Sequence, residues 1–304
     1  MISSFESFVD NHYANGCLTL ISDTNNRVYR LDGDQGPVAI KHITDPDIPL
    51  PYLATVNNTL GQQIPTQRII EVHLATNQQP YDVVVSEFID GENLSSALRR
   101  HTIETSVVSG FLVEFIDAML EIPPHCDGYG LFKNNAPMFT TRTEFVEHYA
   151  NRYWGRARPF FDSDVQDLVD SWVAGGLAGL IIDEHPDAMI AIDANLKNFI
   201  VTPQGSITVL NVPIIANSTI THGLAAIAVH LRHLPVRDQF IHTALNRFPE
   251  ARPELLAHYE LWNMLGIVSF FAVREPHSPN RWQSFSSPKP VRQDFAEMAR
   301  TLLA

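Results

Sequence analysis

Alternating apolar and polar positions run through residues 1–90 and predict a small sheet. Residues 28–31 form a short β-rich run, 32–36 are a cluster of turn-forming residues, and 37–43 alternate with β-branched side chains, which together is the pattern of a hairpin. We expect strands within 17–44, 68–72 and 81–88, and a helix over 53–60 that Gly61 ends.

Apolar residues recur with helical spacing over most of residues 91–304. The segments with this spacing are 93–100, 104–120, 143–154, 163–183 and 251–273. Residues 188–212 interrupt them with three short apolar runs around a Pro-Gln-Gly turn, which predicts a hairpin. The chain therefore divides into a strand-rich part, 1–90, and a larger helical part, 91–304, and we expect an α+β fold without internal repeats.

The charge balance argues against two classes of partner. The sequence has 21 Lys and Arg against 34 Asp and Glu, a net charge of −13. Proteins that bind nucleic acid or anionic lipid need basic surfaces to neutralise phosphates, so we expect neither partner here. The hydrophobic share of 45% against a charged share of 18% predicts a sizeable buried core.

The sequence contains few features that would indicate export, membrane insertion or metal binding. No basic segment followed by an apolar run begins the sequence, and the longest apolar stretches, 173–182 and 264–273, are shorter than the roughly 20 residues that span a bilayer. Cys17 and Cys126 are too few for a disulfide framework or a cysteine-based zinc site. We therefore expect a cytoplasmic protein with no membrane segment, and we interpret His230 and His233 as packing or surface residues.

Six segments of the sequence are informative because of the order in which they occur. They are 21–31, Val38-Ala39-Ile40-Lys41, 64–72, 84–94, the run Asp193-Ala194-Asn195-Leu196-Lys197-Asn198 with the strand that follows it, and 207–212. In this order they resemble the aminoglycoside phosphotransferase and choline kinase branch of the protein-kinase-like fold. The resemblance implies a two-lobed fold, with a small antiparallel-sheet N-lobe and a larger helical C-lobe.

The resemblance also implies a nucleotide site in the N-terminal part. Lys41 would supply positive charge to the α- and β-phosphates of ATP, and the segment 22–26 would be the nucleotide loop. The backbone of the segment after the strand 81–88 would bind adenine. The residues implied for the nucleotide are Ser22, Thr24, Asn25, Lys41, Glu87 and Ile89.

The chemistry itself would belong to the 188–212 hairpin. Phosphoryl transfer needs positioned phosphates, a bridging Mg²⁺ ion and a carboxylate that orients the attacking hydroxyl. Asp193 would be that catalytic carboxylate, while Asn198 and Asn211 would offer amide oxygens to Mg²⁺ or Mn²⁺. The segment 205–221 contains no Asp or Glu, so no shift of register adds an acidic ligand there.

Several positions depart from the family pattern. The nucleotide loop 22–26 has no glycine to let amides approach phosphates, and Asp23 within it would repel them unless a metal or a turn hydrogen bond engages its carboxylate. The helix after Lys41 offers no carboxylate to that lysine. Ala191 stands where the family has a loop-bracing His, Asn211 where it has a metal-binding Asp, and the family's Asp-Leu-Ala is replaced by the run 222–225.

These departures leave two functions open. One is an atypical ATP-dependent phosphotransferase acting on a hydroxyl of a small molecule or a peptide, the latter with a partner enzyme. The other is a pseudokinase that keeps the fold as a scaffold for a ligand or a protein partner. The sequence does not separate ATP from GTP.

Aromatic and acidic residues of the C-terminal part are candidates for an acceptor cleft; they are Glu254, Tyr259, Glu260, Trp262 and Trp282. Among them, we favour a core position for Trp262 and a surface or lid position for Trp282.

Overall fold

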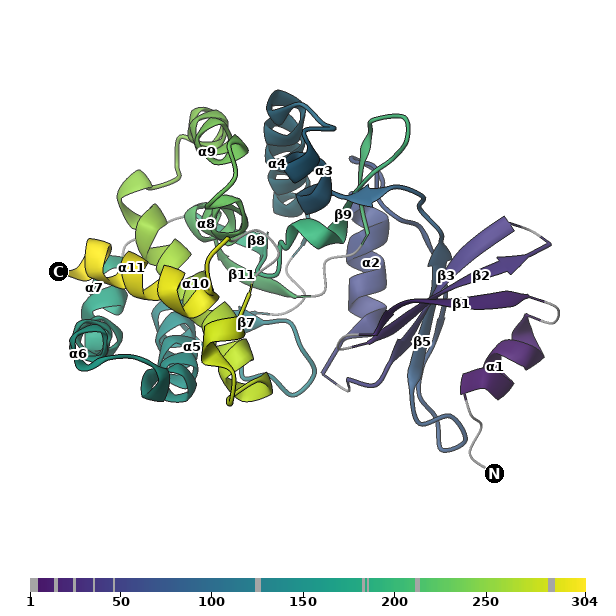
Figure 1. Cartoon of the computed structure of the whole chain (residues 1–304), viewed down its shortest axis with the longest axis horizontal. Coiled ribbons are helices and arrows are strands. Elements are labelled where there is room, and N and C mark those ends of the chain that lie inside the picture. The colour runs from purple at the N-terminus through teal and green to yellow at the C-terminus, as the bar shows by residue number, and fades with distance from the viewer. Residues whose placement is uncertain are drawn as a thin grey trace. The chain divides into compact units, whose positions relative to one another are not determined.

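The chain forms two compact units in the computed structural model (Figure 1), each described here in turn. The first unit contains 1–92, 133–135 and 200–213, and the second contains 93–132, 136–199 and 214–304. The residues that the structure describes are 5–13, 16–23, 26–34, 36–45, 47–123, 127–181, 184, 186–210, 214–283 and 288–304.

A five-stranded antiparallel sheet is the centre of the first unit. Its order is β1-β2-β3-β5-β4. The strands are β1 (Cys17–Asp23), β2 (Arg27–Gly33), β3 (Gly36–Ile43), β4 (Ile69–His73) and β5 (Asp82–Glu87). The expected hairpin is β2–β3, and Gly36, at its turn, has a φ of 97° that favours glycine over any other residue. The strands expected from the alternating pattern are therefore confirmed.

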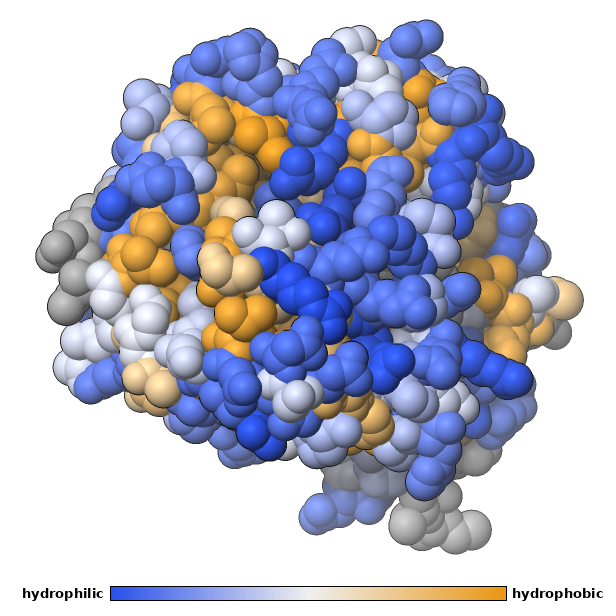
Figure 2. Space-filling model, turned by 60° about the vertical axis from the view of Figure 1, so that its left-hand side comes forward, coloured by the Kyte–Doolittle hydropathy of each residue, from blue (hydrophilic) through white to orange (hydrophobic). Residues whose placement is uncertain are grey.

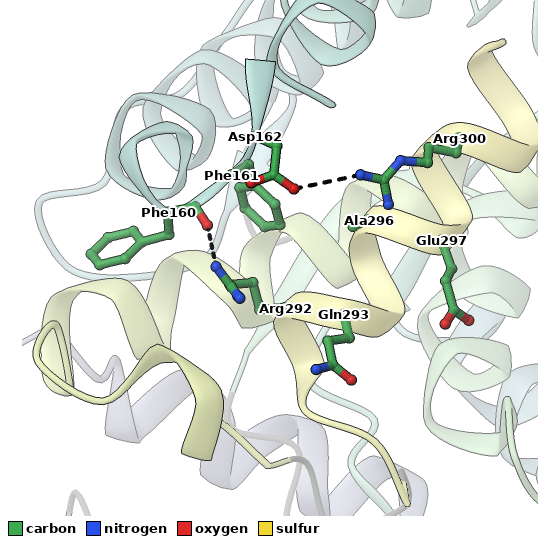
Figure 3. Close-up of a pocket in the computed structure, with 8 residues that line it drawn as sticks. All are labelled: Phe160, Phe161, Asp162, Arg292, Gln293, Ala296, Glu297 and Arg300. Atoms are coloured by element: carbon green, nitrogen blue, oxygen red, sulfur yellow. Dashed lines mark hydrogen bonds and ion pairs between the residues drawn. The ribbon is translucent and has the colours of Figure 1, made fainter. Parts of the chain in front are cut away.

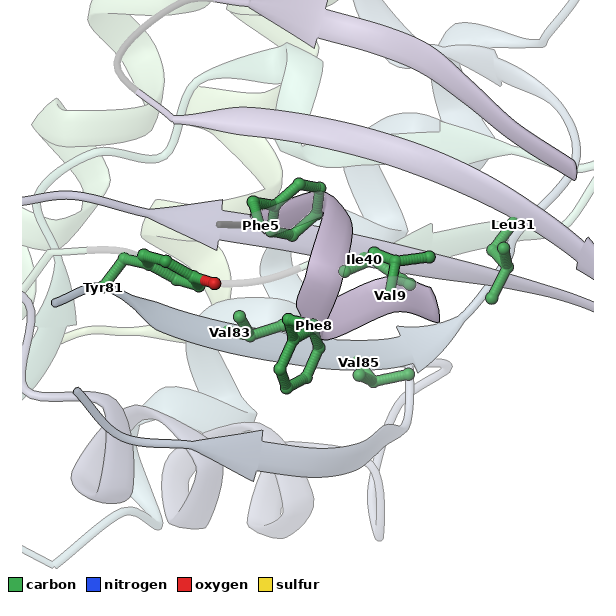
Figure 4. Close-up of a cluster of buried hydrophobic side chains, with 8 residues drawn as sticks. All are labelled: Phe5, Phe8, Val9, Leu31, Ile40, Tyr81, Val83 and Val85. Atoms are coloured by element: carbon green, nitrogen blue, oxygen red, sulfur yellow. The ribbon is translucent and has the colours of Figure 1, made fainter. Parts of the chain in front are cut away.

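Each face of this sheet is covered by one helix. Helix α1 (Phe5–His12) packs apolar side chains against Ile40 and Val83 and forms a cluster of buried residues on one face (Figure 4). Helix α2 (Leu50–Leu60) covers the other face, where Leu50 packs with Ile43 and Val84. The central strands β3 and β5 thus bury side chains on both faces, which explains why they are rich in Val and Ile.

Three short strands mark where the chain passes between the units. They are β6 (Glu92–Asn93), β9 (Phe199–Val201) and β10 (Ile207–Val209), in the order β10-β9-β6. Gly91, with a φ of 150°, precedes β6, and a Cβ there would lie 2.2 Å from the carbonyl oxygen of Val201. Only glycine fits this close approach of two backbones.

The second unit is helical around a small sheet of order β7-β11-β8. Its strands are β7 (Gly130–Leu131), β8 (Asp187–Ala191) and β11 (Ile215–Thr219). The helices are α3 (Leu94–Arg100), α4 (Thr105–Leu120), α5 (Arg142–Ala157), α6 (Ser163–Ser171), α7 (Leu177–Ile181), α8 (Ile220–Leu231), α9 (Val236–Arg247), α10 (Pro253–Arg274) and α11 (Val291–Leu303). With an antiparallel-sheet unit followed by a helical unit, the expected α+β fold class is confirmed.

Helices α8 and α10 form the centre of the second unit. All twelve residues of α8 are buried, as expected for a helix that is apolar on every side. Helix α10 is long and apolar enough to cross a membrane by length and composition, yet 61% of its most apolar window is buried inside the unit. We therefore interpret α10 as a core helix, as the sequence predicted for 264–273.

Two local expectations were wrong. The segment 163–183 is not one helix, because the backbone kinks at Gly175 (φ 129°) between α6 and α7. Trp282 does not lie on the surface. Its side chain is fully buried against Phe160 and Phe271, and its indole N–H donates to the carbonyl oxygen of Glu275 at 2.9 Å. A polar, proline-rich local sequence does not exclude burial of a large aromatic side chain that finds a partner for its N–H.

Candidate functional site

A short loop after β8 carries the residue predicted to be catalytic, Asp193. The loop is fixed at its start by Ile192, whose N–H donates to the carbonyl oxygen of Ile214 at 3.0 Å. It is fixed along its length by the buried side chains of Ala194 and Leu196. At its end, Phe199 makes edge-to-face contacts with two phenylalanines of α4 (Phe111 and Phe115). One backbone hydrogen bond and three buried apolar side chains therefore hold this loop in place.

Hydrogen bonds inside the loop bring Asp193 and Asn198 together. The Nδ2 group of Asn198 donates to the carbonyl oxygen of Asp193 at 3.2 Å. The backbone N–H of Asn198 donates to the carbonyl oxygen of Asn195 at 2.8 Å, and the Asn195 side chain accepts from the N–H of Lys197 at 3.1 Å. The side-chain amide nitrogen of Asn198 is therefore engaged within the loop.

The carboxylate of Asp193 is half-buried and, within the described ranges, forms no ion pair. His230 of α8 is buried nearby. Burial lowers the pKa of His230, Asp193 acts to raise it, and Lys197 acts to lower it. The net direction is downward, so the His230 imidazole is neutral near pH 7.

His222 lies in the run that lacks the family's acid. It is fully buried, it stacks on Tyr259 with ring centroids 4.4 Å apart, and its Nδ1 atom lies 2.8 Å from the Oγ atom of Ser218. Burial lowers its pKa to about 3. A neutral aromatic side chain therefore lies at the start of α8, one residue before Gly223, where the family resemblance implies a carboxylate.

Lys41 lies on the α2 side of the first unit's sheet. Directly paired residues share a face, and one such row runs from Ser22 to Val28, Lys41 and Val84 across β1, β2, β3 and β5. Ser22 and Lys41 are thus brought onto one face. Helix α2 contains no Asp or Glu, so it offers the Lys41 ammonium no carboxylate.

The nucleotide loop is described only in part. Thr24 and Asn25 lie outside the described residues. Asp23 forms an exposed ion pair with Arg27 at 3.4 Å, so its charge is engaged by a neighbour four residues away. A metal or a turn hydrogen bond was expected at Asp23, and the structure shows this side-chain pair instead.

In the predicted adenine-binding segment, the backbone groups of Glu87 already have hydrogen-bond partners, and those of Ile89 have none among the described residues. Glu87 donates its N–H to the carbonyl oxygen of Arg68 at 3.0 Å, and its own carbonyl oxygen accepts from the Nε2 group of Gln67 at 2.7 Å. Among the described residues, the backbone groups of Ile89 have no hydrogen-bond partner. Of the two residues, Ile89 is therefore the one whose backbone N–H and C=O groups are better placed to bind adenine. Gln67, which occupies the carbonyl oxygen of Glu87, was not singled out by the sequence analysis.

The predicted acceptor residues lie in the core or on the surface. Tyr259, Glu260 and Trp262 are buried inside the second unit, where Glu260 accepts from Arg237 at 2.7 Å. Glu254 is exposed and paired with Arg252. The sequence interpretation of Trp262 as a core residue is confirmed, and an acceptor role is wrong for its two buried neighbours.

One pocket of the second unit lies apart from the Asp193 loop. It has a volume of about 200 Å³ and lies between the 160–162 segment and α11 (Figure 3). Its two arginines are engaged by protein groups, Arg292 by the carbonyl oxygen of Phe160 and Arg300 by Asp164, both at 2.8 Å. On the face that Figure 2 turns forward, apolar side chains form separate patches interrupted by polar ones.

Comparisons with known proteins give a fold and no close relative. No family model and no curated sequence matches the chain. A thermostable mutant of aminoglycoside phosphotransferase APH(4)-Ia, in ternary complex with AMP-PNP and hygromycin B, matches with a TM-score of 0.74 at 15% identity, over 99% of this chain and 98% of that one. A fructosamine-3-kinase of Haemophilus somnus matches at 0.63 (14% identity, 95% and 91% covered), and choline kinase LicA of Streptococcus pneumoniae at 0.59 (14% identity, 97% of each).

Proposed function

From the protein-kinase-like fold of a divergent chain, we propose that this protein is a phosphotransferase acting on a small-molecule hydroxyl. The terminal phosphoryl group of ATP would be the group transferred. The observation that carries the proposal is the loop in which Asn198 is tied to the backbone of Asp193, while the Asp193 carboxylate forms no ion pair with any residue that the structure describes. The similar structures that contain a nucleotide and an aminoglycoside support this proposal.

The proposed reaction needs little from the protein beyond position. The substrate oxygen attacks the terminal phosphorus, the bond from that phosphorus to the bridging oxygen breaks, and ADP leaves with the electron pair. Asp193 accepts the hydrogen bond of the attacking hydroxyl and receives its proton. Lys41 supplies the charge that the leaving phosphates require, on the face it shares with Ser22.

A metal ion fits this site only when the phosphates of a bound nucleotide supply part of its coordination. In the part of the chain that the structure describes, no three His, Cys, Asp or Glu side chains are grouped to hold a metal. Asn198 Oδ1 is an oxygen donor of the kind that Mg²⁺ takes, and Mg²⁺ is commonly bound by one or two protein oxygens together with phosphates and water. When bound, the ion would neutralise charge on the phosphates. Asn211, the second proposed ligand, lies outside the described residues.

A thermal-shift experiment tests the nucleotide part of the proposal. ATP with Mg²⁺ or Mn²⁺ should raise the melting temperature, since a ligand at 100 times its Kd stabilises by about 2.7 kcal/mol. Lys41→Ala should abolish the shift. Lys289→Ala, which removes an exposed lysine paired with Glu297, should preserve it. No shift at millimolar nucleotide would contradict the phosphotransferase proposal and favour the pseudokinase alternative.

Asn211→Asp tests the metal part. The change adds a carboxylate where the family resemblance implies one, so the Mg²⁺ concentration needed for half-maximal nucleotide stabilisation should fall. The matched control is Asn195→Asp, which adds the same charge to the loop at a residue whose side chain is used as an internal cap. Unchanged metal dependence in Asn211→Asp would show that residue 211 does not contact the ion.

A further inference from the structure

Helix α8 follows strand β8 toward the Asp193 loop. The helix begins directly after Thr219, which is paired with Asp187 at the start of β8. One turn later Gly223 lies against Ile190, so closely that a Cβ on the glycine would be 2.8 Å from the Cγ2 atom of Ile190. The helix therefore advances along β8 in the direction of the chain, toward the loop that follows this strand.

The same face of α8 reaches the loop two turns further on. Residues seven apart lie on one face of a helix and about 10.5 Å apart along its axis, and the residue seven after Gly223 is His230. Strand β8 ends at Ala191, and Asp193 follows two residues later. The helix therefore carries His230 past the end of β8, on the side of the Asp193 loop.

The environment of His230 agrees with this placement. Its side chain is buried, and its electrostatic neighbours, Asp193 and Lys197, are both residues of the loop. His233, three residues further along the chain, faces elsewhere, since its Nε2 atom lies 2.6 Å from the carboxylate of Asp294 in α11. The two histidines of this segment therefore have different roles.

We propose that His230 is a positioning residue that braces the Asp193 loop from α8. The proposal rests on the phosphotransferase function proposed above and names a residue through which it operates. The loop lacks a His at Ala191, and the run 222–225 lacks an acid, so the two braces implied by the family resemblance are absent. The buried imidazole of His230, on the helix face that continues from Gly223, takes their place.

Steady-state ATP hydrolysis, with water in place of the acceptor, tests the role in the reaction. His230→Leu should lower kcat at least tenfold and leave the KM for ATP within twofold, because the nucleotide-binding residues are unchanged. His230→Asn keeps a polar N–H and should recover most of the rate. In an Asp193→Asn background, His230→Leu should have no further effect. Equal losses in both backgrounds would overturn the proposal.

Hydrogen exchange gives a readout that needs no activity. In His230→Leu the amides of 192–198 should exchange at least tenfold faster, whereas His230→Asn should retain their protection. His222→Leu is the matched control, a buried histidine of the same helix whose electrostatic partner is Arg142 and which should leave the loop unchanged. Faster exchange in a protein without hydrolysis would support the brace and contradict the phosphotransferase function. Unchanged exchange in His230→Leu would overturn the brace.

Discussion

Asp294 and Asp193 are two carboxylates of the same helical unit in opposite surroundings. Asp294 of α11 is fully buried and accepts from the Nε group of Arg232 at 2.8 Å, while its other oxygen lies 2.6 Å from His233. Asp193 is half-buried, forms no ion pair with a described residue, and adjoins a histidine whose pKa is lowered by burial. The Asp294 carboxylate is paired with two basic side chains, and the Asp193 carboxylate has no ion-pair partner in the part of the chain that the structure describes.

The difference separates a structural acid from a candidate catalytic acid. A buried carboxylate without a partner costs several kcal/mol, so a fold that needs one for stability supplies a cation. A carboxylate that must accept a hydroxyl proton needs free lone pairs and some access to solvent or substrate. Asp193 meets the second requirement and Asp294 the first, so each variant below has a different expected readout.

The largest effect is expected at the structural acid. Asp294→Ala leaves Arg232 half-buried without its carboxylate and should lower the free energy of unfolding by about 3–5 kcal/mol. Chemical denaturation measures this change. Asp238→Ala is the control, because Asp238 is 95% exposed and lies 3.5 Å from Arg237, a pair that should contribute less than about 1 kcal/mol. Similar losses in the two variants would contradict the assignment of Asp294.

Asp193→Asn should lower the reaction rate strongly and the stability only slightly, the reverse of what Asp294→Ala should do to stability. The rate of ATP hydrolysis should fall by about 100-fold or more, because the amide cannot receive the proton, while the free energy of unfolding should change by less than about 1 kcal/mol. Steady-state kinetics and denaturation of the same preparation give both numbers. A large loss of stability with little loss of rate would place Asp193 with Asp294 as a structural residue.

His222 gives a third case, a buried group kept neutral without a counter-ion. Its pKa is lowered to about 3 by burial, whereas an unfolded histidine titrates near 6.5, so the unfolded state binds the extra proton in this window. Stability should therefore fall as the pH drops from about 6.5 toward 3, by up to about 1.4 kcal/mol per unit. His222→Gln should reduce this slope, and His277→Gln, an exposed control, should not.

The smallest effect is expected at Asp23, a carboxylate that is paired but exposed. Its side chain is 53% exposed and that of Arg27 is 55% exposed, so Asp23→Asn should change stability by less than about 1 kcal/mol. Removing the charge should tighten ATP binding a few-fold, as measured by calorimetry, because like charges repel. Asp32→Asn, which breaks the exposed pair with Arg30, should leave ATP binding unaltered. Equal affinities in wild-type and Asp23→Asn would place this loop away from the phosphates.

Local patterns allowed much of the fold to be predicted. The β2–β3 hairpin follows from alternation and a glycine turn, and α10 from a long run of helical spacing. The Asp193–Asn198 segment is recognisable because its geometry is built by hydrogen bonds between residues five or fewer apart. Such information lies within a short window of the sequence.

Contacts between distant segments were not predictable in the same way. Arg232 and Asp294 are 62 residues apart, and neither position carries a local sign of its partner. Trp282 was assigned to the surface from its polar neighbours, although partners on two other segments bury it. His230 had a usable signal, since it stands seven residues after Gly223, but only knowledge of which helix face meets β8 gives that spacing a meaning.

Gly223 also limits which side chains fit at the start of α8. Ile190, which is buried and β-branched, fills the space that even a methyl group at 223 would need. Leu224 and Ala225 match the end of the Asp-Leu-Ala that the family resemblance implies, so the glycine stands where the resemblance implies an acid. An Asp introduced at 223 would clash with Ile190. A single substitution at 223 would therefore not install that acid unless residue 190 also became smaller.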